Sequence, residues 1–152
     1  MNFRKRVLLG ITTGVIALSA LSFSTSAYGG DNNIGYSFDV PANQGFGYSA
    51  PQYRGPSGTN VPWKVNFTYS SEGVGTYMYY FLAGDEWINK SRFSDYKKVQ
   101  QGSGEKYFRA YEGAYNKNVR LGAQNNNDSR QGFKVSGYWD EESAKHNFSY
   151  WD

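Results

Sequence analysis

Short segments in which apolar and polar residues alternate recur along this chain, and they constrain its fold more than any other feature. Residues 63–70 alternate strictly, with aromatic and aliphatic side chains starting at Trp63 and polar ones at Lys64. A period of two is typical of a β-strand with one buried face. The same pattern predicts strands in residues 34–40, 119–123 and 133–139, and a weaker pattern predicts an edge strand at 96–99. We therefore expect a mainly β protein, either a small antiparallel sheet or a β-sandwich.

Two segments depart from this alternation. Residues 76–82 (TYMYYFL) are apolar on both faces, as expected of a central strand that is covered on each side. Further along, Ser103 is a suitable N-cap for a helix. Residues at the spacing of one helix face then follow, namely Tyr107, Ala110, Tyr111, Ala114 and Tyr115. The sequence therefore predicts one helix near 104–116 that covers part of the sheet.

The first 27 residues have the three zones of a secretory signal peptide. Arg4–Arg6 form a basic start, residues 7–21 are mostly apolar, and small residues at Thr25 and Ala27 form a cleavage site. An apolar run of about 15 residues is short for a membrane span, which needs about 20, so a permanent anchor is the less favoured alternative. We expect a secreted, extracellular protein that is cleaved near Ala27.

The rest of the chain divides by composition into three parts. Residues 28–61 contain three of the four prolines and are rich in Gly and Asn, which predicts an arm with one strand at 34–40 and a loop at 41–61. Residues 62–140 hold most of the alternating segments and predict the β-rich domain. Residues 141–152 predict a C-terminal tail.

The composition also excludes several kinds of site. The chain has no Cys and a single His, so Cys-ligated metals, Cys nucleophiles and multi-His metal sites are ruled out. That residue, His146, lies in a polar C-terminal stretch, and we interpret it as a solvated tail residue. Three of the 16 basic residues lie in residues 1–27, which leaves 13 basic residues against 13 acidic ones. This balance argues against a nucleic-acid partner, and we expect no cofactor and no metal.

Four motifs in the second half of the chain occur together, namely Pro62–Asn66 (PWKVN), Gly102–Gly104 (GSG), Asn125–Asn127 (NNN) and Ser136–Glu142 (SGYWDEE). Through them, residues 60–143 resemble a family of small exported proteins of spore-forming Gram-positive bacteria, catalogued as a domain of unknown function. The resemblance implies a secreted β-rich domain and carries over no catalytic or binding residue. In size, export signal and Gly- and Tyr-rich pattern, the chain also loosely resembles the lactococcin-type bacteriocins, which implies a bacteriocin-like activity as a hypothesis.

Basic residues concentrate in residues 90–120, which contain eight Lys or Arg residues and only three Asp or Glu residues. For an exported protein, the matching partners are an anionic cell-wall polymer or an anionic membrane surface. The alternative is a solvated face of the predicted helix. The candidate binding residues are Lys97, Lys98, Lys106, Arg109, Lys117 and Arg120. We therefore expect a non-enzymatic protein that acts at a bacterial cell envelope.

Two other functions stay open. The 10 Phe, 14 Tyr and 4 Trp exceed what a small domain buries completely, and exposed rings would suit a carbohydrate-binding or wall-binding module. Alternatively, carboxylates from separate loops, at Asp85, Glu86 and Asp140–Glu142, could form the acid pair of a small glycan hydrolase. Neither acidic cluster has a diagnostic spacing, and we interpret both as charged turn residues that follow strands.

Overall fold

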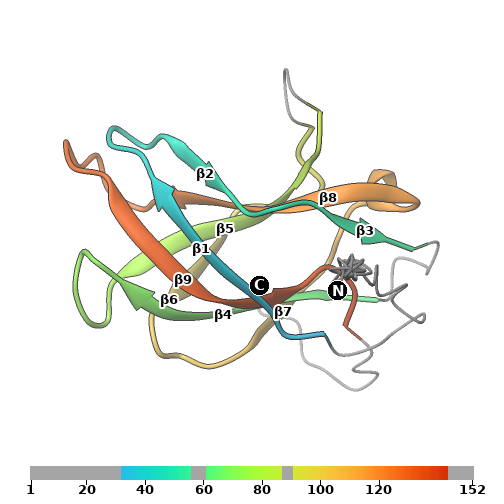
Figure 1. Ribbon diagram of the computed structural model, residues 1–152, viewed down its shortest axis with the longest axis horizontal. Helices are drawn as coiled ribbons and strands as arrows, with labels where there is room; N and C mark the ends of the chain where they lie inside the picture. Colours follow the sequence, from blue (N-terminus) through green and yellow to red (C-terminus); the bar gives the residue numbers. More distant parts are fainter. Residues whose placement is uncertain (1–31, 56–60, 87–90, 144–152) are drawn as a thin grey trace, which may run out of the picture.

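The computed structural model describes residues 32–55, 61–86 and 91–143, which form two antiparallel sheets packed face to face (Figure 1). The four-stranded sheet has the order β1-β9-β4-β7. The five-stranded sheet has the order β2-β8-β5-β6, and the short β3 also pairs with β8. The strands are β1 (Ile34–Val40), β2 (Phe46–Tyr48), β3 (Gln52–Arg54), β4 (Trp63–Ser70), β5 (Tyr77–Gly84), β6 (Lys97–Gln100), β7 (Lys106–Phe108), β8 (Lys117–Asn125) and β9 (Phe133–Asp140). The predicted mainly β class is confirmed, in its sandwich form.

Side chains from both sheets meet in one hydrophobic core between them. Both Trp63 on β4 and Trp139 on β9 are 0% exposed, as the alternation of their strands predicts. Two tyrosines of the core pair their hydroxyls, since Tyr36 Oη donates to Tyr80 Oη at 2.9 Å. The core therefore accepts phenol groups without leaving them unpaired.

The central position of β5 explains why its sequence is apolar on both faces. β5 lies between β8 and β6, so the prediction of a central strand at 76–82 is confirmed. Its side chains Met78, Tyr80 and Leu82 belong to the core. Phe81 faces the opposite side of the sheet and is still only 3% exposed, because other aromatic side chains cover it there.

A β-bulge in β4 changes which of its residues are buried. The register between β4 and β9 shifts between Phe67 and Tyr69. Because a bulge inserts one extra residue, the alternation of faces slips by one position beyond it. Tyr69, which strict alternation places on the buried face, is 50% exposed, and Ser70 is buried in its stead.

The predicted helix near 104–116 is wrong. Lys106–Phe108 form β7, which pairs with the start of β4 and buries Phe108 in the core. Only a single 3-10 turn, η1 (Glu112–Ala114), lies in this range. The helical spacing of Tyr and Ala residues is overridden because β7 completes the edge of the four-stranded sheet, a long-range pairing that helix propensity does not describe.

The segment predicted as a loop at 41–61 contains β2 and β3. β1 belongs to one sheet, whereas β2 and β3 belong to the other, so the described part of residues 28–61 contributes strands to both sheets. At the other end of the chain, residues 141–143 of the predicted tail are buried.

Several predicted features lie outside the described residues. They are the signal peptide at 1–27, His146 and the remainder of the tail at 144–152. Within the described ranges, no helix has the length and apolar character needed to cross a membrane.

Candidate functional site

The outer surfaces of the two sheets differ in chemistry. On the four-stranded sheet, the residues that alternate with the core are mostly polar, such as Ser37, Asn66 and Ser136. On the five-stranded sheet, the corresponding surface is rich in rings. We call this second surface the aromatic face, formed by Phe46, Tyr48, Tyr77, Tyr79, Phe81 and Tyr96.

Three rings at the centre of the aromatic face pack edge to face. Phe81 contacts Tyr96 and Phe46 with ring centroids 4.8 Å and 5.6 Å apart. Gly122 on the neighbouring β8 makes room for this ring, since a Cβ at that position would lie 2.4 Å from Phe81. Phe46 and Tyr96 stack with their planes 11° apart and remain 42% and 38% exposed. Phe81 is nearly perpendicular to both of these rings, and the three form a partly exposed aromatic cluster.

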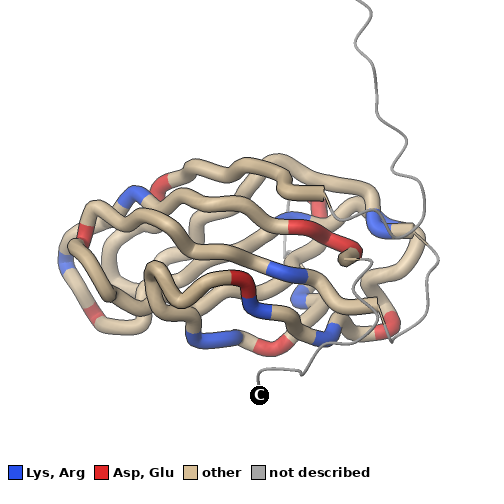
Figure 2. Tube along the Cα trace, turned by 90° about the horizontal axis from the view of Figure 1, so that it is seen from below, with Lys and Arg blue, Asp and Glu red and all other residues tan. Residues whose placement is uncertain are grey.

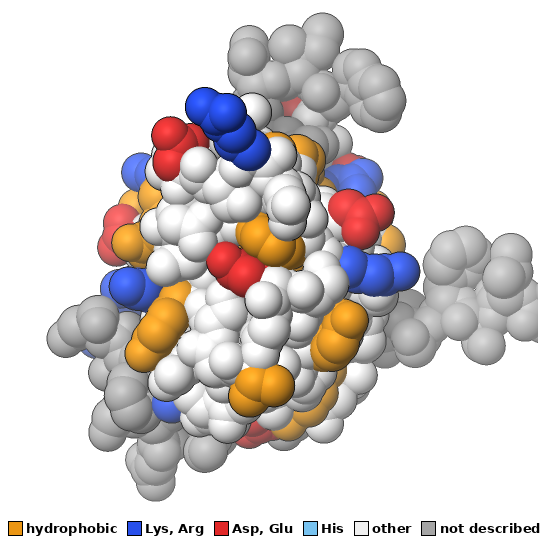
Figure 3. All heavy atoms as spheres, turned by 90° about the vertical axis from the view of Figure 1, so that its left-hand side faces the viewer, with side chains coloured by type: hydrophobic (Ala, Val, Ile, Leu, Met, Phe, Trp, Pro, Cys, Tyr) orange, Lys and Arg blue, Asp and Glu red, His pale blue; other side chains and the backbone are white. Residues whose placement is uncertain are grey.

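This gathering of rings contrasts with the end of the sandwich that carries the β1–β2 and β8–β9 turns. Figure 3 shows that apolar side chains there are separated by polar atoms, with both signs of charge between them. Singly scattered apolar groups are ordinary on a protein surface, whereas a cluster of exposed rings is less so. The aromatic face is therefore the more informative surface.

Basic residues gather along the side of the sandwich formed by β6 and β7, which are edge strands of the two sheets. The two strands approach each other, since the ammonium of Lys97 on β6 lies 5.9 Å from the ring centroid of Phe108 on β7. Lys117, at the start of β8, lies 5.1 Å from the ring of Phe93. We call this set the basic edge, formed by Arg92, Lys97, Lys98, Lys106, Arg109 and Lys117.

The basic edge and the aromatic face meet in two cation–aromatic pairs. The guanidinium of Arg92 lies 4.7 Å from the ring centroid of Tyr96, and the ammonium of Lys98 lies 4.7 Å from that of Tyr77. All four side chains are exposed. Exposed pairs of this kind contribute only about 0.5–1 kcal/mol, so the cations stay available to an anion. The positive charges of the basic edge therefore adjoin the exposed rings of the aromatic face.

The acidic residues close to the basic edge only partly cancel its charge. Glu105 accepts hydrogen bonds from Tyr107 Oη at 2.5 Å and from Lys64 Nζ at 3.2 Å, and these partners hold the pKa of its carboxyl below the usual value. Lys64 neutralises Glu105, and Asp95 and Glu112 are the other acidic residues in the described part of residues 90–120. Figure 2 shows Lys and Arg positions gathered along the lower margin of the molecule, with single acidic positions between them.

Arg120 is not part of this group, contrary to the sequence prediction. Its Nη2 lies 2.5 Å from the carboxylate of Asp85, and its Nη1 donates to the carbonyl of Ser49 at 2.8 Å. This pairing draws Arg120 toward the β2–β3 segment, on the opposite edge of the five-stranded sheet from β6. The structure thus brings together five of the six predicted residues. It also adds Arg92, which sequence analysis counted in the basic segment without choosing it as a candidate.

The acidic cluster at the end of β9 is buried, so its interpretation as solvated turn residues is wrong. Asp140, Glu141 and Glu142 are at most 7% exposed. Asp140 accepts hydrogen bonds from the backbone N–H of Asn32 at 2.7 Å and of Glu142 at 2.9 Å. Burial raises the pKa of the Asp140 carboxyl to about 7, and burial also raises the pKa of Glu141.

A buried arginine holds this acidic cluster in place. Arg54 is 0% exposed and donates to the carbonyl of Glu141 and, at 2.5 Å, to the carbonyl of Val61. Glu142 accepts from the backbone N–H of Gly55 at 3.1 Å. Among the described residues, no group of three or more His, Asp or Glu side chains is placed to hold a metal ion. The hydrogen bonds of Arg54 and Glu142 therefore join the segment around the end of β3 to the end of β9.

The comparison with known proteins identifies a family without an assigned activity. Residues 23–143 match a family described as protein of unknown function (DUF2712), which confirms the resemblance to a domain of unknown function. No curated protein and no solved structure matches the chain. Because the match covers most of the sequence, the chain belongs to the DUF2712 family of proteins of unknown function.

Proposed function

We propose that this protein is exported and acts without catalysis at a bacterial cell envelope, where it binds an anionic wall polymer. The observation that carries the proposal is the contact of Lys98 with Tyr77 and of Arg92 with Tyr96, which joins the basic edge to the aromatic face. A surface that binds a wall polymer with sugar units and phosphate groups needs both cations and exposed aromatic rings. Cations bind phosphate oxygens, and exposed rings pack against the apolar faces of sugars.

The shape of the aromatic face favours a polymer over a lipid bilayer. Phe46 on β2, Phe81 on β5 and Tyr96 just before β6 pack against one another on the face of the sheet. Side chains that anchor a protein in a bilayer enter the interfacial region of the lipid, whereas rings packed against one another on a sheet can support a polymer chain that lies across that face. Membrane binding is therefore the competing outcome of the test.

The cellular setting is part of the same proposal. The three zones of residues 1–27 support export, and the resemblance to small exported proteins of Gram-positive bacteria supports a wall as the place of action. A bacteriocin-like activity is the corresponding biological role. Growth inhibition of related bacteria by purified residues 28–152 tests that role separately from binding.

The binding test uses residues 28–152 with Gram-positive walls, with and without teichoic acid, and with vesicles of anionic lipid. The variant Lys98→Glu/Lys117→Glu reverses two exposed charges of the basic edge. The control Arg130→Glu/Lys134→Glu makes the same charge change at exposed positions away from it. Because each basic residue near an anionic surface contributes about 1 kcal/mol, we expect the first variant to bind at least about tenfold more weakly and the control to bind nearly as well as wild type.

Salt and the wall preparation distinguish the alternatives. Exposed charges are screened over about 10 Å at 0.1 M salt, so binding should weaken steeply as salt rises. Equal pelleting of the two charge-reversal variants, or indifference to salt, would contradict the proposal. Binding to vesicles with no binding to teichoic-acid-containing walls would assign the surface to membranes.

A further inference from the structure

Two cations of the basic edge border the aromatic face at positions that the strand register fixes. Lys98 lies opposite Tyr79 of β5, and Arg92 lies opposite Ala83. These two β5 positions are four residues apart, so they are on the same face of the sheet. An antiparallel strand rises about 3.4 Å per residue, which places the two cation positions about 13 Å apart along β5.

The side chains keep this separation because both lean in the same direction along the strand. The ammonium of Lys98 lies on the ring of Tyr77, two residues beyond the β5 position that Lys98 faces. The guanidinium of Arg92 lies on the ring of Tyr96. Tyr96 contacts Phe81, which is two residues from the β5 position that Arg92 faces, again toward Tyr77. The two positive groups therefore remain about four residues of strand apart.

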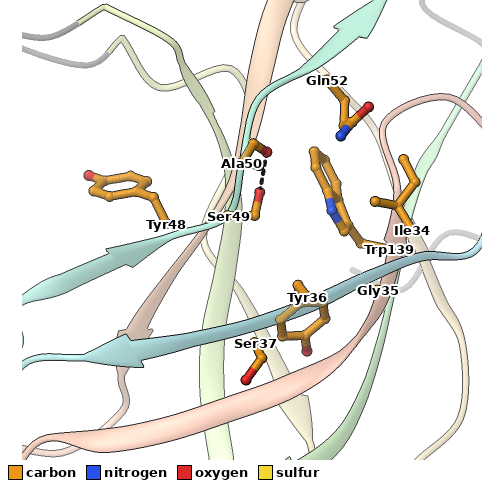
Figure 4. A pocket seen from close by; sticks show the side chains of 9 residues that line it. All are labelled: Ile34, Gly35, Tyr36, Ser37, Tyr48, Ser49, Ala50, Gln52 and Trp139. Atoms are coloured by element: carbon orange, nitrogen blue, oxygen red, sulfur yellow. Dashed lines mark hydrogen bonds between the residues drawn. The ribbon is translucent and has the colours of Figure 1, made fainter. Parts of the chain in front are cut away.

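The surface between the two cations consists of rings. Phe46 stacks on Tyr96, and both contact the ring of Phe81. Tyr48 contacts Phe81 as well, with ring centroids 6.1 Å apart. Figure 4 shows the ring of Tyr48 directed away from the buried indole of Trp139, so Tyr48 belongs to this outer surface and not to the core.

This arrangement determines what a ligand carries between two phosphates. A phosphate placed on Phe46 and Phe81 would be desolvated against apolar rings without a cation of its own, which costs free energy. Asp95, the residue before Tyr96, would add repulsion. The part of a ligand that bridges the two cations is therefore uncharged and has an apolar face, as a sugar ring does.

The distance between the cations gives the length of that bridging part. By the bond lengths of an extended chain, neighbouring phosphates are about 7 Å apart in a glycerol phosphate polymer, and about 13 Å apart when the backbone repeat also contains a hexose. Two glycerol phosphate units would also reach from Lys98 to Arg92, but they would place a phosphate on the rings. The spacing and the rings thus both favour a sugar in the backbone of the polymer.

We propose that this surface selects a wall polymer whose backbone repeat contains a sugar, with consecutive phosphates on Lys98 and Arg92 and the sugar packed on Phe46 and Tyr96. The inference rests on the proposed function and specifies the class of polymer. A glycerol phosphate polymer without sugar in its backbone is the disfavoured ligand.

The test is isothermal titration calorimetry of residues 28–152 with two synthetic probes, in about 0.05 M NaCl to limit screening. The first probe is glucosylglycerol with a phosphate at each end. The second is a chain of two glycerols and three phosphates, whose outer phosphates have about the same spacing. A surface that is merely basic would bind the second probe at least as tightly, because it carries one more phosphate. We expect the first probe to bind at least about fivefold more tightly than the second.

A ring deletion tests where the preference comes from. Phe46→Ala removes an exposed ring between the cations and leaves Lys98 and Arg92 in place, so the preference for the first probe should fall to about twofold or less. The matched control is Tyr69→Ala, which removes a similarly exposed ring from the other sheet and should retain the full preference. Circular dichroism checks the fold of both variants.

The outcomes separate this inference from the proposed function. Equal or tighter binding of the second probe by wild type would overturn the inference, and so would the absence of binding of both probes. A full preference retained by folded Phe46→Ala would do so as well. The proposed function is judged independently, by whether charge reversal at Lys98 and Lys117 weakens sedimentation with walls.

Discussion

The buried carboxyl of Asp140 predicts that this protein loses stability as the pH rises from about 5 to about 8. Burial raises the pKa of this group from 3.8 to about 7. Between these two values the folded state binds more protons than the unfolded state does. The stability that Asp140 contributes is therefore highest below the pKa that this group has in the unfolded chain. It falls as the pH rises through the pKa that the group has in the folded protein.

The size of the effect follows from the pKa shift. One pKa unit corresponds to about 1.4 kcal/mol, so ionising Asp140 in the folded protein costs up to about 4 kcal/mol. That is a large part of the 5–15 kcal/mol that stabilises an ordinary domain. Glu141 acts in the same direction because burial raises its pKa as well. Glu105, whose pKa is lowered, changes stability mainly at more acidic pH.

The assay is urea unfolding of wild type and Asp140→Asn at about pH 5 and about pH 8, followed by circular dichroism. Asn cannot ionise, so the variant should lose much less stability than wild type between the two pH values. It also replaces one of the two oxygens that accept from Asn32 and Glu142, so its stability at about pH 5 should be about 1 kcal/mol lower. The reasoning is refuted if the two proteins have the same pH slope, or if wild type is more stable at about pH 8.

Three further changes should alter the unfolding free energy by amounts that the same urea assay can measure. Trp63→Ala removes a fully buried indole and should cost about 3–5 kcal/mol, whereas a loss below about 1 kcal/mol would place this side chain outside the core. Arg54→Met leaves the carbonyls of Glu141 and Val61 without their donor and removes the positive charge near the buried carboxylates, which should cost about 3–5 kcal/mol, and an unchanged midpoint would contradict the role of that arginine. Gly137→Ala should cost about 1–3 kcal/mol because its Cβ would lie 1.9 Å from the backbone oxygen of Asn66. Gly35→Ala on the neighbouring β1 is the control, since its Cβ would meet nothing within 4 Å, and similar losses in both variants would refute the steric argument.

Strands with one buried face could be predicted from the sequence, because side-chain alternation reports directly which face meets the core. Trp63 and Trp139 were placed correctly for this reason. Alternation predicts the wrong buried residues where a strand contains a β-bulge that no sequence feature marks. The bulge near Tyr69 is such a case, since neither Gly nor Pro marks it.

The helical spacing at 104–116 failed for a different reason. Tyr107 and Phe108 are buried by pairing with β4, which is about 40 residues earlier in the chain, and local spacing contains no information about that pairing. The short strands β2 and β3 were missed likewise, because each has only three residues and depends on β8 for its hydrogen bonds.

The candidate site was predicted in part. A local excess of Lys and Arg locates the basic edge, because the consecutive edge strands β6 and β7 carry three of its six residues and Arg109 directly follows β7. The partner of an individual cation depends on the fold, so the pairing of Arg120 with Asp85 could not be foreseen. The burial of Asp140–Glu142 could not be foreseen either. Their sequence is typical of a charged turn, and only the fold places Arg54 beside them.

The pairing of β1 with β9 determines how the domain would respond to mechanical force. Ile34 lies opposite Trp139, so the beginning of the first strand and the end of the last strand are at the same end of the sandwich (Figure 1). The hydrogen bonds between antiparallel strands run perpendicular to the strands. A force that separates these two ends would therefore load the bonds one after another, beginning at Ile34 and Trp139, instead of loading all of them together. Pulled from its ends, the domain would open by peeling β1 from the sheet at low force, while the β5–β8 pair at the centre of the other sheet stayed intact.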